Sequence, residues 1–557
     1  MPSPTRLESS HPAAGPSPAG QAPSGSGRRL RSTRGWLTLG ATLVAGAALA
    51  ACGSSSGSAT STSGPSSGSS SGSSGTVDPS GVLKYGVDLD NTFSGTFDPG
   101  QSTNDCSYTE YTALYNSLLA PANDAVLPSE AVSYTSTPTT ITFHLRPGAT
   151  FSNGTPVTAS AVEASINHIK TSPFRFSLTY IQSIQVVNPT TVTFTLTKPV
   201  AGDVLWAMTY IDGMVMDPAA IPNAGTSPIG SGPFTLSSYQ QGSSMVLKAN
   251  PNYWDKSAYK LGGVDFVQVS AGPQEVSALE TGAVDMLAVE PEDYASVEHL
   301  PGIGIATTRS SDYLLMQTRQ NAAPFNDPKV RAALEYAVDR NAINEAVFSG
   351  LGEPAFQPFP SWSVAYNPSV GNKYTYQPAK AKAMLAAAGH PGGIDFSLVI
   401  PGGSATFSRT AQILQAEMAP AGFHMTIQQV NPTDLVTEVY LHDQGDAVLD
   451  EELTNGPDWA NNFEGEYTGV GFEDQHLGTT NPTLTPLIEQ ALTSLSPTVQ
   501  GPPMRQASQI AMATGTEVPL IFEPSVIAYN ESRVGGHVVA PIGQCRSNLA
   551  GIYIKKG

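Results

Sequence analysis

Histidine and serine spacing indicates which reactions this chain could perform. Eight histidines follow Cys52, but no pair forms a His-Glu-x-x-His motif or a close Cys/His cluster typical of zinc ligands. His442 and Asp443 have metal-binding groups, yet they read as a loop before a strand. The Gly-x-Ser-x-Gly string at 68–72 lacks the flanking strand and helix of a nucleophile elbow. No phosphate loop is present, so any ATP hydrolysis would belong to a partner. An extracellular hydrolase remains the less favoured alternative, and we expect no catalytic residue and no metal.

Cys52 ends a segment with the composition of an export and lipidation signal. Four arginines between positions 28 and 34 precede an apolar run, residues 36–51, which is short for a membrane span. The run ends in Leu-Ala-Ala-Cys, which resembles the bacterial lipoprotein signal, in which the thiol receives diacylglycerol before cleavage. We therefore predict residues 1–51 as a signal peptide and Cys52 as the lipidated N-terminus, on the outer face of the bacterial cell membrane. An ordinary signal ending in cysteine is the alternative, and export by the Sec or the twin-arginine route stays open.

Length and charge limit what the exported chain can be. Removing residues 1–51 takes away five arginines and Glu8, so the formal net charge of -19 becomes about -23 over 506 residues. Such acidity disfavours nucleic acid and anionic lipid as partners, so we expect membrane contact through the lipid anchor only. Residues 52–80 are mostly Ser, Gly and Thr and are predicted to form a flexible tether. The remainder is too long for one simple core, which predicts two or three lobes.

Cys106 and Cys545 are the cysteines left after lipidation. An even pair in an oxidising compartment suggests one disulfide closing a very long loop. Two buried free thiols are the alternative, because sequence alone does not establish proximity.

The globular part mixes strands and helices without a repeat. Residues 82–90 read as a first strand, and residues 140–145 and 192–196 alternate as half-buried strands. Residues 330–338 have one apolar stripe with helical spacing. Residues 379–388 and 409–419 are predicted as further helices, the first with proline at its start and glycine at its end.

Several motifs occur in an order that resembles one protein family. They are TITFHLRPGATFSNGTPVTA at 140–159, PIGSGPF at 228–234, NPNYW at 250–254, LETGAVD at 279–285, FNDPKVRAAL at 325–334 and AVDR at 337–340. In the first of these, Asn153-Gly154 supplies a tight turn and Thr158 can cap the helix that follows. The set resembles family 5 extracellular solute-binding proteins, the peptide- and nickel-binding components of ABC importers.

The resemblance implies an α/β, two-lobed, periplasmic-binding-protein-like fold with a hinge and an early inserted small domain. It assigns 82–120, 226–310 and 521–557 to a discontinuous lobe I, 121–225 to the inserted domain and 311–520 to lobe II. Cys106 and Cys545 would then both belong to lobe I, which favours their pairing. The implied protein is a monomer without enzymatic activity or cofactor. It would capture a peptide or peptide-like solute between its lobes and deliver it to an ABC permease with an associated ATPase.

The resemblance also points to candidate ligand-binding residues. Peptide-binding members pair an aspartate in the second lobe with the peptide ammonium, a charge-assisted contact. The corresponding stretch, LDEELTNGPDW at 449–459, puts Asn455 at that position and keeps Asp458 nearby. A gap of one or two residues would instead bring Glu451 or Glu452 to the ammonium, and a loop that only packs at the hinge is a further alternative.

Three other residues are candidates for the cleft. Tyr313 and Gln317 lie at the entrance to the second lobe, and Trp362 offers a stacking surface after a proline-rich loop. Packing in the core is the alternative for each. A sensor or adhesion lipoprotein on the same scaffold, without transport, also fits the sequence.

The lipid signal generates a first prediction. Changing Cys52 to Ser removes the thiol that receives the lipid, so the variant should be released from the membrane fraction or mislocalised. Membrane fractionation and immunoblotting measure this. A Cys52→Ser chain that stays membrane-bound after losing its leader would contradict the prediction.

Overall fold

The computed structural model describes residues 76–557 except 103–104, 123–124, 173–174, 271, 453–457 and 541–546. All of them belong to the compact unit Ser71–Gly557. The predicted signal peptide, Cys52, Asn455 and Cys545 lie outside the described residues.

Strands and helices are mixed along the chain. The strands are β1 (Val77–Asp78), β2 (Val82–Val87), β3 (Leu119–Ala122), β4 (Ala125–Pro128), β5 (Ala131–Thr137), β6 (Thr140–Leu145), β7 (Ile181–Asn188), β8 (Thr191–Leu196), β9 (Phe234–Gln240), β10 (Ser244–Ala249), β11 (Gly263–Gln268), β12 (Met286–Ala288), β13 (Ile303–Thr318), β14 (Glu353–Pro354), β15 (Ile394–Pro401), β16 (Phe423–Val430), β17 (Ala447–Glu452), β18 (Val518–Asn530), β19 (Val534–Gly536) and β20 (Ile552–Lys555). The α-helices are α1 (Leu89–Thr92), α2 (Tyr108–Leu114), α3 (Ala159–Ile169), α4 (Ala201–Ala207), α5 (Pro273–Glu280), α6 (Tyr294–Val297), α7 (Pro328–Leu334), α8 (Arg340–Val347), α9 (Pro378–Ala387), α10 (Ala405–Met418), α11 (Asn461–Tyr467), α12 (Phe472–Leu477), α13 (Thr485–Ala491) and α14 (Pro497–Thr514).

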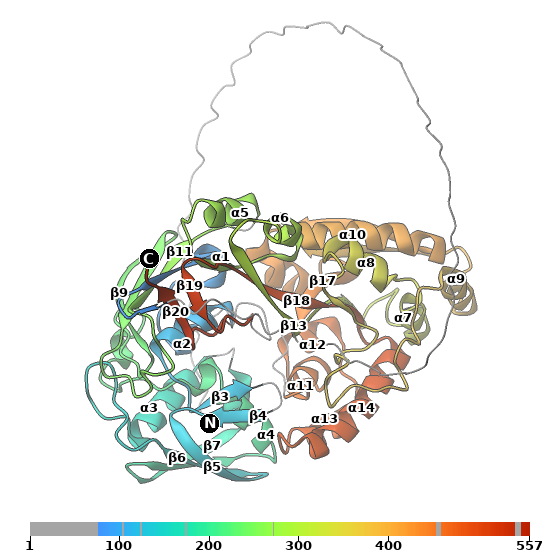
Figure 1. Ribbon diagram of the computed structural model, residues 1–557. Helices are drawn as coiled ribbons and strands as arrows, with labels where there is room; N and C mark the ends of the chain where they lie inside the picture. The colour runs from blue at the N-terminus through green and yellow to red at the C-terminus, as the bar shows by residue number, and fades with distance from the viewer. Residues whose placement is uncertain are drawn as a thin grey trace, which may run out of the picture. The chain divides into compact units, whose positions relative to one another are not determined.

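One mixed sheet of 11 strands organises this unit (Figure 1). Its order is β16-β15-β17-β13-β18-β12-β2-β11-β10-β9, and β14 also pairs with β18. Strand β2 runs parallel to β11 and β12, while β15 runs parallel to β16 and β17. The sheet therefore contains two groups of parallel strands. Parallel strands that are covered on both faces typically have continuous apolar sequences. Strand β15 is an example, because five of its last six residues are buried.

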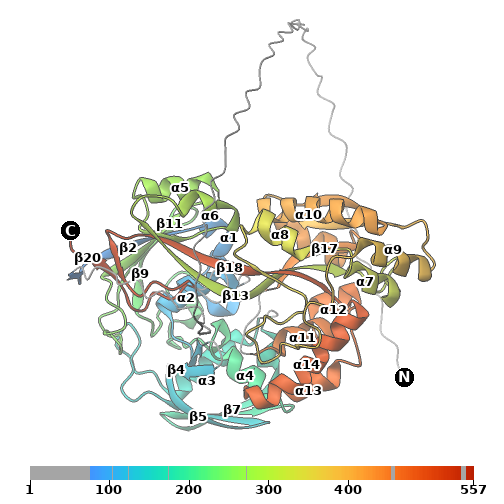
Figure 2. The ribbon, with the colours of Figure 1, turned by 45° about the vertical axis from the view of Figure 1, so that its right-hand side comes forward.

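Strands β13 and β18 join these two groups. They pair antiparallel from Ile303 opposite Asn530 to Met316 opposite Val518. Strand β12 adds to one end of this ladder and β17 to the other. Figures 1 and 2 show the two long strands crossing between the two groups of parallel strands. The predicted lobe boundaries, 310/311 and 520/521, both fall within these strands, and the boundaries themselves stay predictions.

A second, antiparallel sheet lies within the range predicted as the inserted domain. Its order is β5-β6-β8-β7, and α3 and α4 accompany it. The predicted alternation is confirmed in β6, where Ile141, Phe143 and Leu145 are buried. Thr158 caps α3 as expected, because its hydroxyl accepts the backbone N–H of Ala161 at 3.3 Å.

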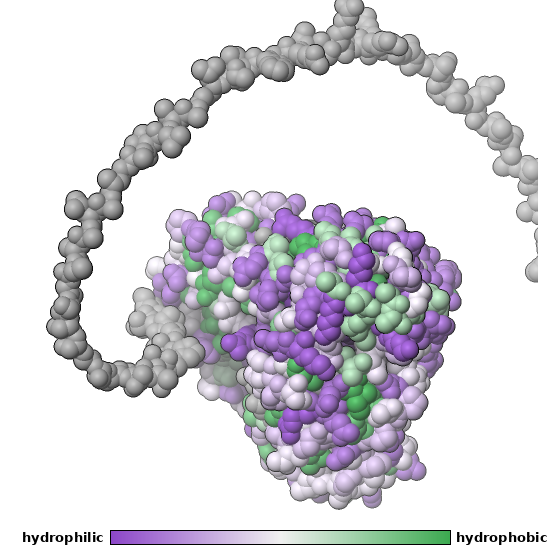
Figure 3. Space-filling model, turned by 90° about the vertical axis from the view of Figure 1, so that its right-hand side faces the viewer, coloured by the Kyte–Doolittle hydropathy of each residue, from purple (hydrophilic) through white to green (hydrophobic). Residues whose placement is uncertain are grey.

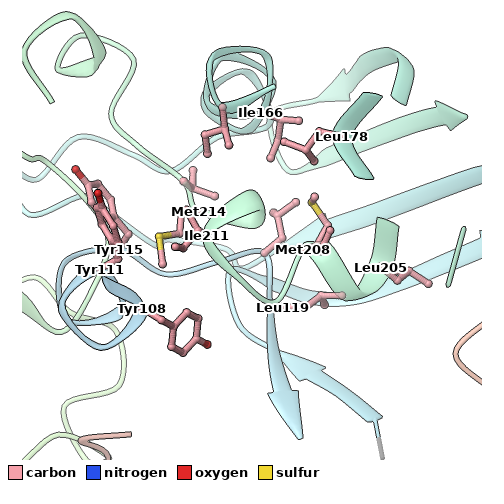
Figure 4. Close-up of a cluster of buried hydrophobic side chains, with 14 of the residues drawn as sticks. Tyr108, Tyr111, Tyr115, Leu119, Ile166, Leu178, Leu205, Met208, Ile211 and Met214 are labelled. Carbon is pink, nitrogen blue, oxygen red and sulfur yellow. The ribbon is translucent and has the colours of Figure 1, made fainter. Parts of the chain in front are cut away.

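Tyrosine side chains of α2, and that of Tyr115 directly after it, belong to a large buried cluster. Tyr108, Tyr111 and Tyr115 lie beside Met214 and Ile211 in the cluster of Figure 4. The Tyr115 hydroxyl donates to the Phe97 carbonyl at 2.8 Å. Helix α2 is therefore held rigidly by its buried face, which matters because the same helix contributes to the cleft described below.

The second sheet also contacts the helices that follow residue 458. The Gly202 N–H donates to the Leu492 carbonyl at 2.9 Å. Tyr180 and Lys198 reach the buried Glu464 carboxylate at 2.9 and 2.7 Å. These contacts connect the predicted inserted domain with the predicted lobe II.

Three local expectations differ from the structure. The first strand ends at Val87 rather than residue 90, because Leu89 begins the short α1 with its side chain buried. Helix α7 ends at Leu334, short of the apolar stripe to residue 338, because Asp339 starts a new helix by accepting the Ala342 N–H. Within the predicted tether, β1 pairs with β20, a long-range contact that composition does not reveal.

The helices predicted at 379–388 and 409–419 are confirmed as α9 and α10, although α10 begins earlier, at Ala405, and the predicted turn before α3 is present. Gly154 has a φ of 85°, a backbone conformation that favours glycine. Within the described part of the chain, no helix combines the length and apolarity needed to cross a bilayer. The face in Figure 3 mixes hydrophilic side chains with scattered hydrophobic ones.

Arg340 ties three segments together in the interior of the lobe II range. Its guanidinium donates to the Glu335 carboxylate at 2.7 Å and to the carbonyls of Pro519 and Tyr374 at 2.6 and 3.2 Å. The residue is only 1% exposed. This explains the arginine of the AVDR motif, because one side chain fixes α8 against β18 and the loop before α9.

Replacing Arg340 with alanine should lower the free energy of unfolding by roughly 3–5 kcal/mol. The reason is that the variant leaves a buried carboxylate and two buried carbonyls without their donor. Urea unfolding followed by circular dichroism measures the effect. Arg409→Ala, on the exposed side of α10, is the matched control and should change stability by less than about 0.5 kcal/mol. Equal losses in the two variants would contradict this account of Arg340.

Candidate functional site

A cavity of about 670 Å³ lies where the two groups of parallel strands face each other. One wall comes from the ends of β2 and β12, which contribute residues 85–88 and 287–289. The opposite wall comes from the end of β15 and the loop to α10, residues 401–404, and from Glu451 of β17. Residues 524–526 of β18 lie between them. The carboxyl ends of parallel strands are where open α/β folds bind ligands, so this cleft is the candidate site.

Local sequence explains the wall formed by residues 401–404. Pro401 ends β15, and Gly403 takes a φ of 93°, which a side chain would strain. Ser404 then begins α10 by accepting the Phe407 N–H at 3.3 Å. The Pro-Gly-Gly-Ser stretch therefore turns the chain sharply at the cleft and directs the N-terminus of a 14-residue helix toward it.

Carboxylates dominate the charge of the cleft. Five acidic residues line it, and its described lining includes no lysine, arginine or histidine. The five are Asp88, Glu110, Glu275, Glu290 and Glu451. Disulfide-bonded Cys106 and Thr109 also contribute, next to Glu110 at the start of α2.

Glu110 is the most unusual of these acids. It is 1% exposed, and neither carboxyl oxygen has a hydrogen-bond partner among the described residues. Burial raises the pKa of Glu110 to about 7. An unpartnered buried carboxyl group is costly, so Glu110 is a candidate functional residue of the cleft.

Glu451 faces the cleft from the other wall. It belongs to β17 opposite Leu314 of β13. Burial, then the negative charges of Asp312, Glu290 and Asp450, raise the pKa of Glu451 to about 8. Its Oε1 atom is buried without a hydrogen-bond partner in the described structure. Both walls of the cleft thus carry a carboxyl group whose pKa is raised by burial.

A second cavity, of about 620 Å³, lies on the other side of α2. Its walls are mainly α2, the β3–β4 hairpin and residues 253–259 and 547–550. Trp254 lines it, and the Arg146 guanidinium lies 3.5 Å from the centroid of that indole. From the range 311–520 only Ser311 contributes to the described lining. This cavity therefore belongs mostly to one side of β13 and β18.

Asp458 lies away from both cavities, in a group of buried acids. Its carboxylate accepts the Ala460 N–H and the Gln500 side-chain amide, each at 3.2 Å. Asp203 of α4 is held by Asn461 at 2.5 Å, and Glu464 completes the group. Burial, followed by repulsion from Glu464, raises the pKa of Asp458 to about 7. Both hydrogen bonds of Asp458 stay within the predicted lobe II, while the contact between Asn461 and Asp203 joins the two predicted domains. A role of Asp458 in ligand binding stays a prediction.

Tyr313, Gln317 and Trp362 also lie outside the lining of the two large cavities. The Tyr313 hydroxyl donates to the buried Glu517 carboxylate at 2.9 Å. Gln317 accepts the Tyr440 hydroxyl at 3.5 Å, and Trp362 packs edge-on against Trp459 at 5.3 Å. Tyr313 and Asp458 share a recess of about 10 Å³, too small for a solute. Ligand binding by these residues is untested and remains a prediction.

Sequence reasoning missed Glu110, although it named Glu451 as an alternative. A signal was present, because Glu110 is the one charged residue of α2 and lies between Tyr108 and Tyr111, in a helix buried along most of its length. In the described part of the chain, no group of three or more His, Cys, Asp or Glu side chains is positioned to hold a metal ion.

Comparison with known proteins adds the family. Residues 127–472 match the sequence model described as bacterial extracellular solute-binding proteins, family 5 middle. The glutathione-binding protein GsiB of Escherichia coli is 26% identical over 475 residues, covering 80% of this chain and 91% of that protein.

Solved structures share the fold. AgaA of A. tumefaciens in complex with agropinic acid superposes with a TM-score of 0.74 at 24% identity, covering 86% of this chain and 99% of AgaA. DppA, an ABC transporter-associated periplasmic binding protein from Helicobacter pylori in complex with peptide STSA, gives 0.72 at 20% identity, with 86% and 98% covered. NikA of Staphylococcus aureus in complex with Ni(L-His)2 gives 0.70 at 19% identity, with 83% and 97% covered.

The pKa of Glu110 generates a prediction about stability without ligand. Because the folded state raises this pKa from 4.5 to about 7, its stabilising contribution is complete below pH 4.5 and is lost as pH rises through 7. Glu110→Gln removes that loss. Relative to wild type, the variant should therefore gain up to roughly 3 kcal/mol between pH 5 and pH 8.

Urea unfolding at both pH values measures this gain. Glu280→Gln, on the exposed side of α5, is the control and should follow the wild type at both pH values. A Glu110→Gln variant with the same pH dependence as wild type would show that Glu110 ionises freely in the folded protein.

Proposed function

Since the chain belongs to the bacterial extracellular solute-binding proteins of family 5, we propose that it captures a peptide or peptide-like solute for an ABC importer. The solute would occupy the 670 Å³ cleft and then pass to a membrane permease. The chain is a binding protein rather than an enzyme, as its family and named relatives are. ATP hydrolysis would therefore belong to the ATPase partner of the permease.

The observation that carries this proposal is the composition of the cleft walls. One wall comes from β2 and β12, and the other from β15 and β17. These walls are connected through the long strands β13 and β18, whose register is irregular between Arg309 and Tyr313. Bending at that irregularity would separate the walls and open the cleft, as in hinge-closing binding proteins.

The ligand class follows from size and from relatives. A volume of about 670 Å³ lies in the range of small-molecule sites and suits a short peptide. GsiB is named for glutathione, itself a tripeptide derivative, and DppA was solved with a peptide. Both support a peptide-like solute here, while AgaA and NikA indicate how widely ligands vary on this fold.

Anchoring completes the proposal. Cys52 would carry the lipid and the Ser/Gly-rich stretch after it would act as a tether, leaving the binding unit free to meet the permease. The protein would act as a monomer at the outer face of the cell membrane.

Ligand binding and closure should be observable on the mature chain, residues 52–557. We expect mass spectrometry of the purified protein to find a retained peptide. Re-adding it at a hundred times its Kd should stabilise the fold by about 2.7 kcal/mol, visible as a higher Tm. Small-angle scattering should show a smaller radius of gyration with ligand. Tight binding of a retained solute without any compaction would contradict hinge closure, and a retained solute of non-peptide chemistry would contradict the ligand class.

A further inference from the structure

We propose that the contact between α4 of the predicted inserted domain and α11 and α13 of the predicted lobe II is a latch that opens and closes with the cleft. The strength of this latch sets the fraction of closed molecules, and so sets the affinity for the solute from outside the cleft. The inference rests on the hinge closure of the proposed function and adds a second connection between the parts that close.

The first component of the latch joins the end of one helix to the beginning of another. The N–H groups at the start of a helix have no acceptor within that helix. At the start of α4, the N–H groups of Gly202 and Asp203 instead donate to the Leu492 carbonyl, at 2.9 and 3.4 Å. Leu492 caps the C-terminus of α13, so the two helix dipoles meet end to end with opposite partial charges.

Gly202 makes this close approach possible. A Cβ atom at this position would lie 2.8 Å from the Leu492 oxygen and equally close to the backbone of Ser494. These atoms belong to the backbone, so the helices would have to move apart to accept even an alanine. One methyl group at Gly202 therefore loosens the latch without any change of charge.

A buried carboxylate forms the second component. Lys198, just before α4, donates to Glu464 of α11 at 2.7 Å, and the Tyr180 hydroxyl donates to the same oxygen at 2.9 Å. The Glu464 side chain is 1% exposed, so the closed contact depends on the charge-assisted bond from Lys198. Beside this pair, the Asn461 amide of α11 donates to the Asp203 carboxylate of α4 at 2.5 Å.

Apolar side chains accompany these polar contacts. Val204 and Leu205 of α4 belong to the same buried cluster as Ile488 of α13. Separating the two parts would expose this apolar surface to water, which is unfavourable. The latch therefore combines directional bonds with apolar burial, and both favour the closed arrangement.

The latch spans parts that β13 and β18 also connect. The predicted inserted domain is fixed to the lobe I range, where the Ala131 N–H donates to the Leu118 carbonyl at 2.8 Å. Helix α11, which α13 contacts, is fixed to β17 because the Asn462 amide donates to Glu452 at 2.7 Å. Figures 1 and 2 both show α4 beside α13, below the two long strands. Bending of β13 and β18 would carry α11 and α13 away from α4.

Two backbone amides give a direct measure of latch opening. The N–H groups of Gly202 and Asp203 have their acceptor across the contact, so they exchange with deuterated water when the latch opens. Hydrogen exchange with residue-resolved mass spectrometry on the mature chain should show them exchanging at least about tenfold faster than the amides of β8, which pairs on both sides. A saturating tripeptide, trialanine or glutathione, should slow the two amides, because coupling between sites is reciprocal.

Two variants loosen the latch by different means, Gly202→Ala by a steric clash and Lys198→Met by loss of charge. Each should accelerate exchange of the two amides about five- to tenfold and weaken tripeptide binding by a similar factor, because fewer molecules are closed. Gly392→Ala, whose Cβ atom would meet nothing within 4 Å, and Lys248→Met, at an exposed position of β10, are the matched controls and should behave as wild type. The Tm of each variant confirms that it is folded.

Small-angle scattering separates opening of the lobes from fraying of α4. Ligand-free Gly202→Ala and Lys198→Met should both have a larger radius of gyration than wild type. Faster exchange without any change in this radius would show that only the start of α4 frays, and would overturn the latch. Exchange of the two amides in wild type as slow as that of β8 would show a permanent contact, with the same consequence.

Binding then separates this inference from the proposed function. Unchanged tripeptide affinity in both loosened variants would overturn control of affinity by the latch and leave solute binding intact. Failure of wild type to bind either tripeptide, while exchange and radius respond to both substitutions, would support the latch and count against the proposed ligand class.

Discussion

The antiparallel ladder between β13 and β18 is the constraint on which the rest of this structure depends. Every other strand of the large sheet except β14 is attached to one or the other side of this pair, through β17 or through β12. Backbone hydrogen bonds along the ladder cannot be broken piecemeal without leaving buried donors unpaired. Any movement of the two groups of parallel strands relative to each other therefore requires these two strands to bend. Because both groups are attached to this one ladder, the ends of their strands face one another across the cleft.

Acidic residues in the interior are the second theme. Glu110, Glu451, Asp458 and Glu517 are all carboxyl groups whose burial raises their pKa. Their surroundings differ, however. The Glu517 carboxylate receives the Tyr313 hydroxyl, and that of Asp458 receives a backbone N–H and the Gln500 amide. One oxygen of each of these two carboxylates is therefore paired within the fold, while Asp458 Oδ2 and Glu517 Oε1 have no hydrogen-bond partner among the described residues. Glu110 differs because neither of its oxygens has a partner in the described part of the chain.

Sequence alone predicted the parts of the fold that depend on short-range chemistry. The alternation in β6, the Thr158 cap of α3 and the proline at the start of α9 are each decided by residues a few positions apart. The family resemblance supplied the architecture, because its motifs occur in order over most of the chain. The pairing of β1 with β20 was not predictable in this way, since its partners are over 470 residues apart.

The candidate site was harder to predict than the fold. Glu110 and Glu451 are separated by more than 300 residues, and nothing in the local sequence says that their helix and strand border one cavity. Tyr313 and Gln317 lie outside the lining of the two large cavities, and ligand binding by them stays a prediction. A shift of one residue along a strand reverses the face on which a side chain lies, which makes such positions hard to assign from sequence. Asn455 lies outside the described residues, so its predicted role is still open to experiment.

The cleft also suggests how ligand binding and closure can be coupled. A solvated carboxylate loses hydration when a wall closes over it, and the loss is large unless a donor replaces the water. Glu110 and Glu451 line opposite walls of the cleft. A ligand that contacts both walls at once binds the closed arrangement better than the open one, and that difference in affinity is what shifts the equilibrium.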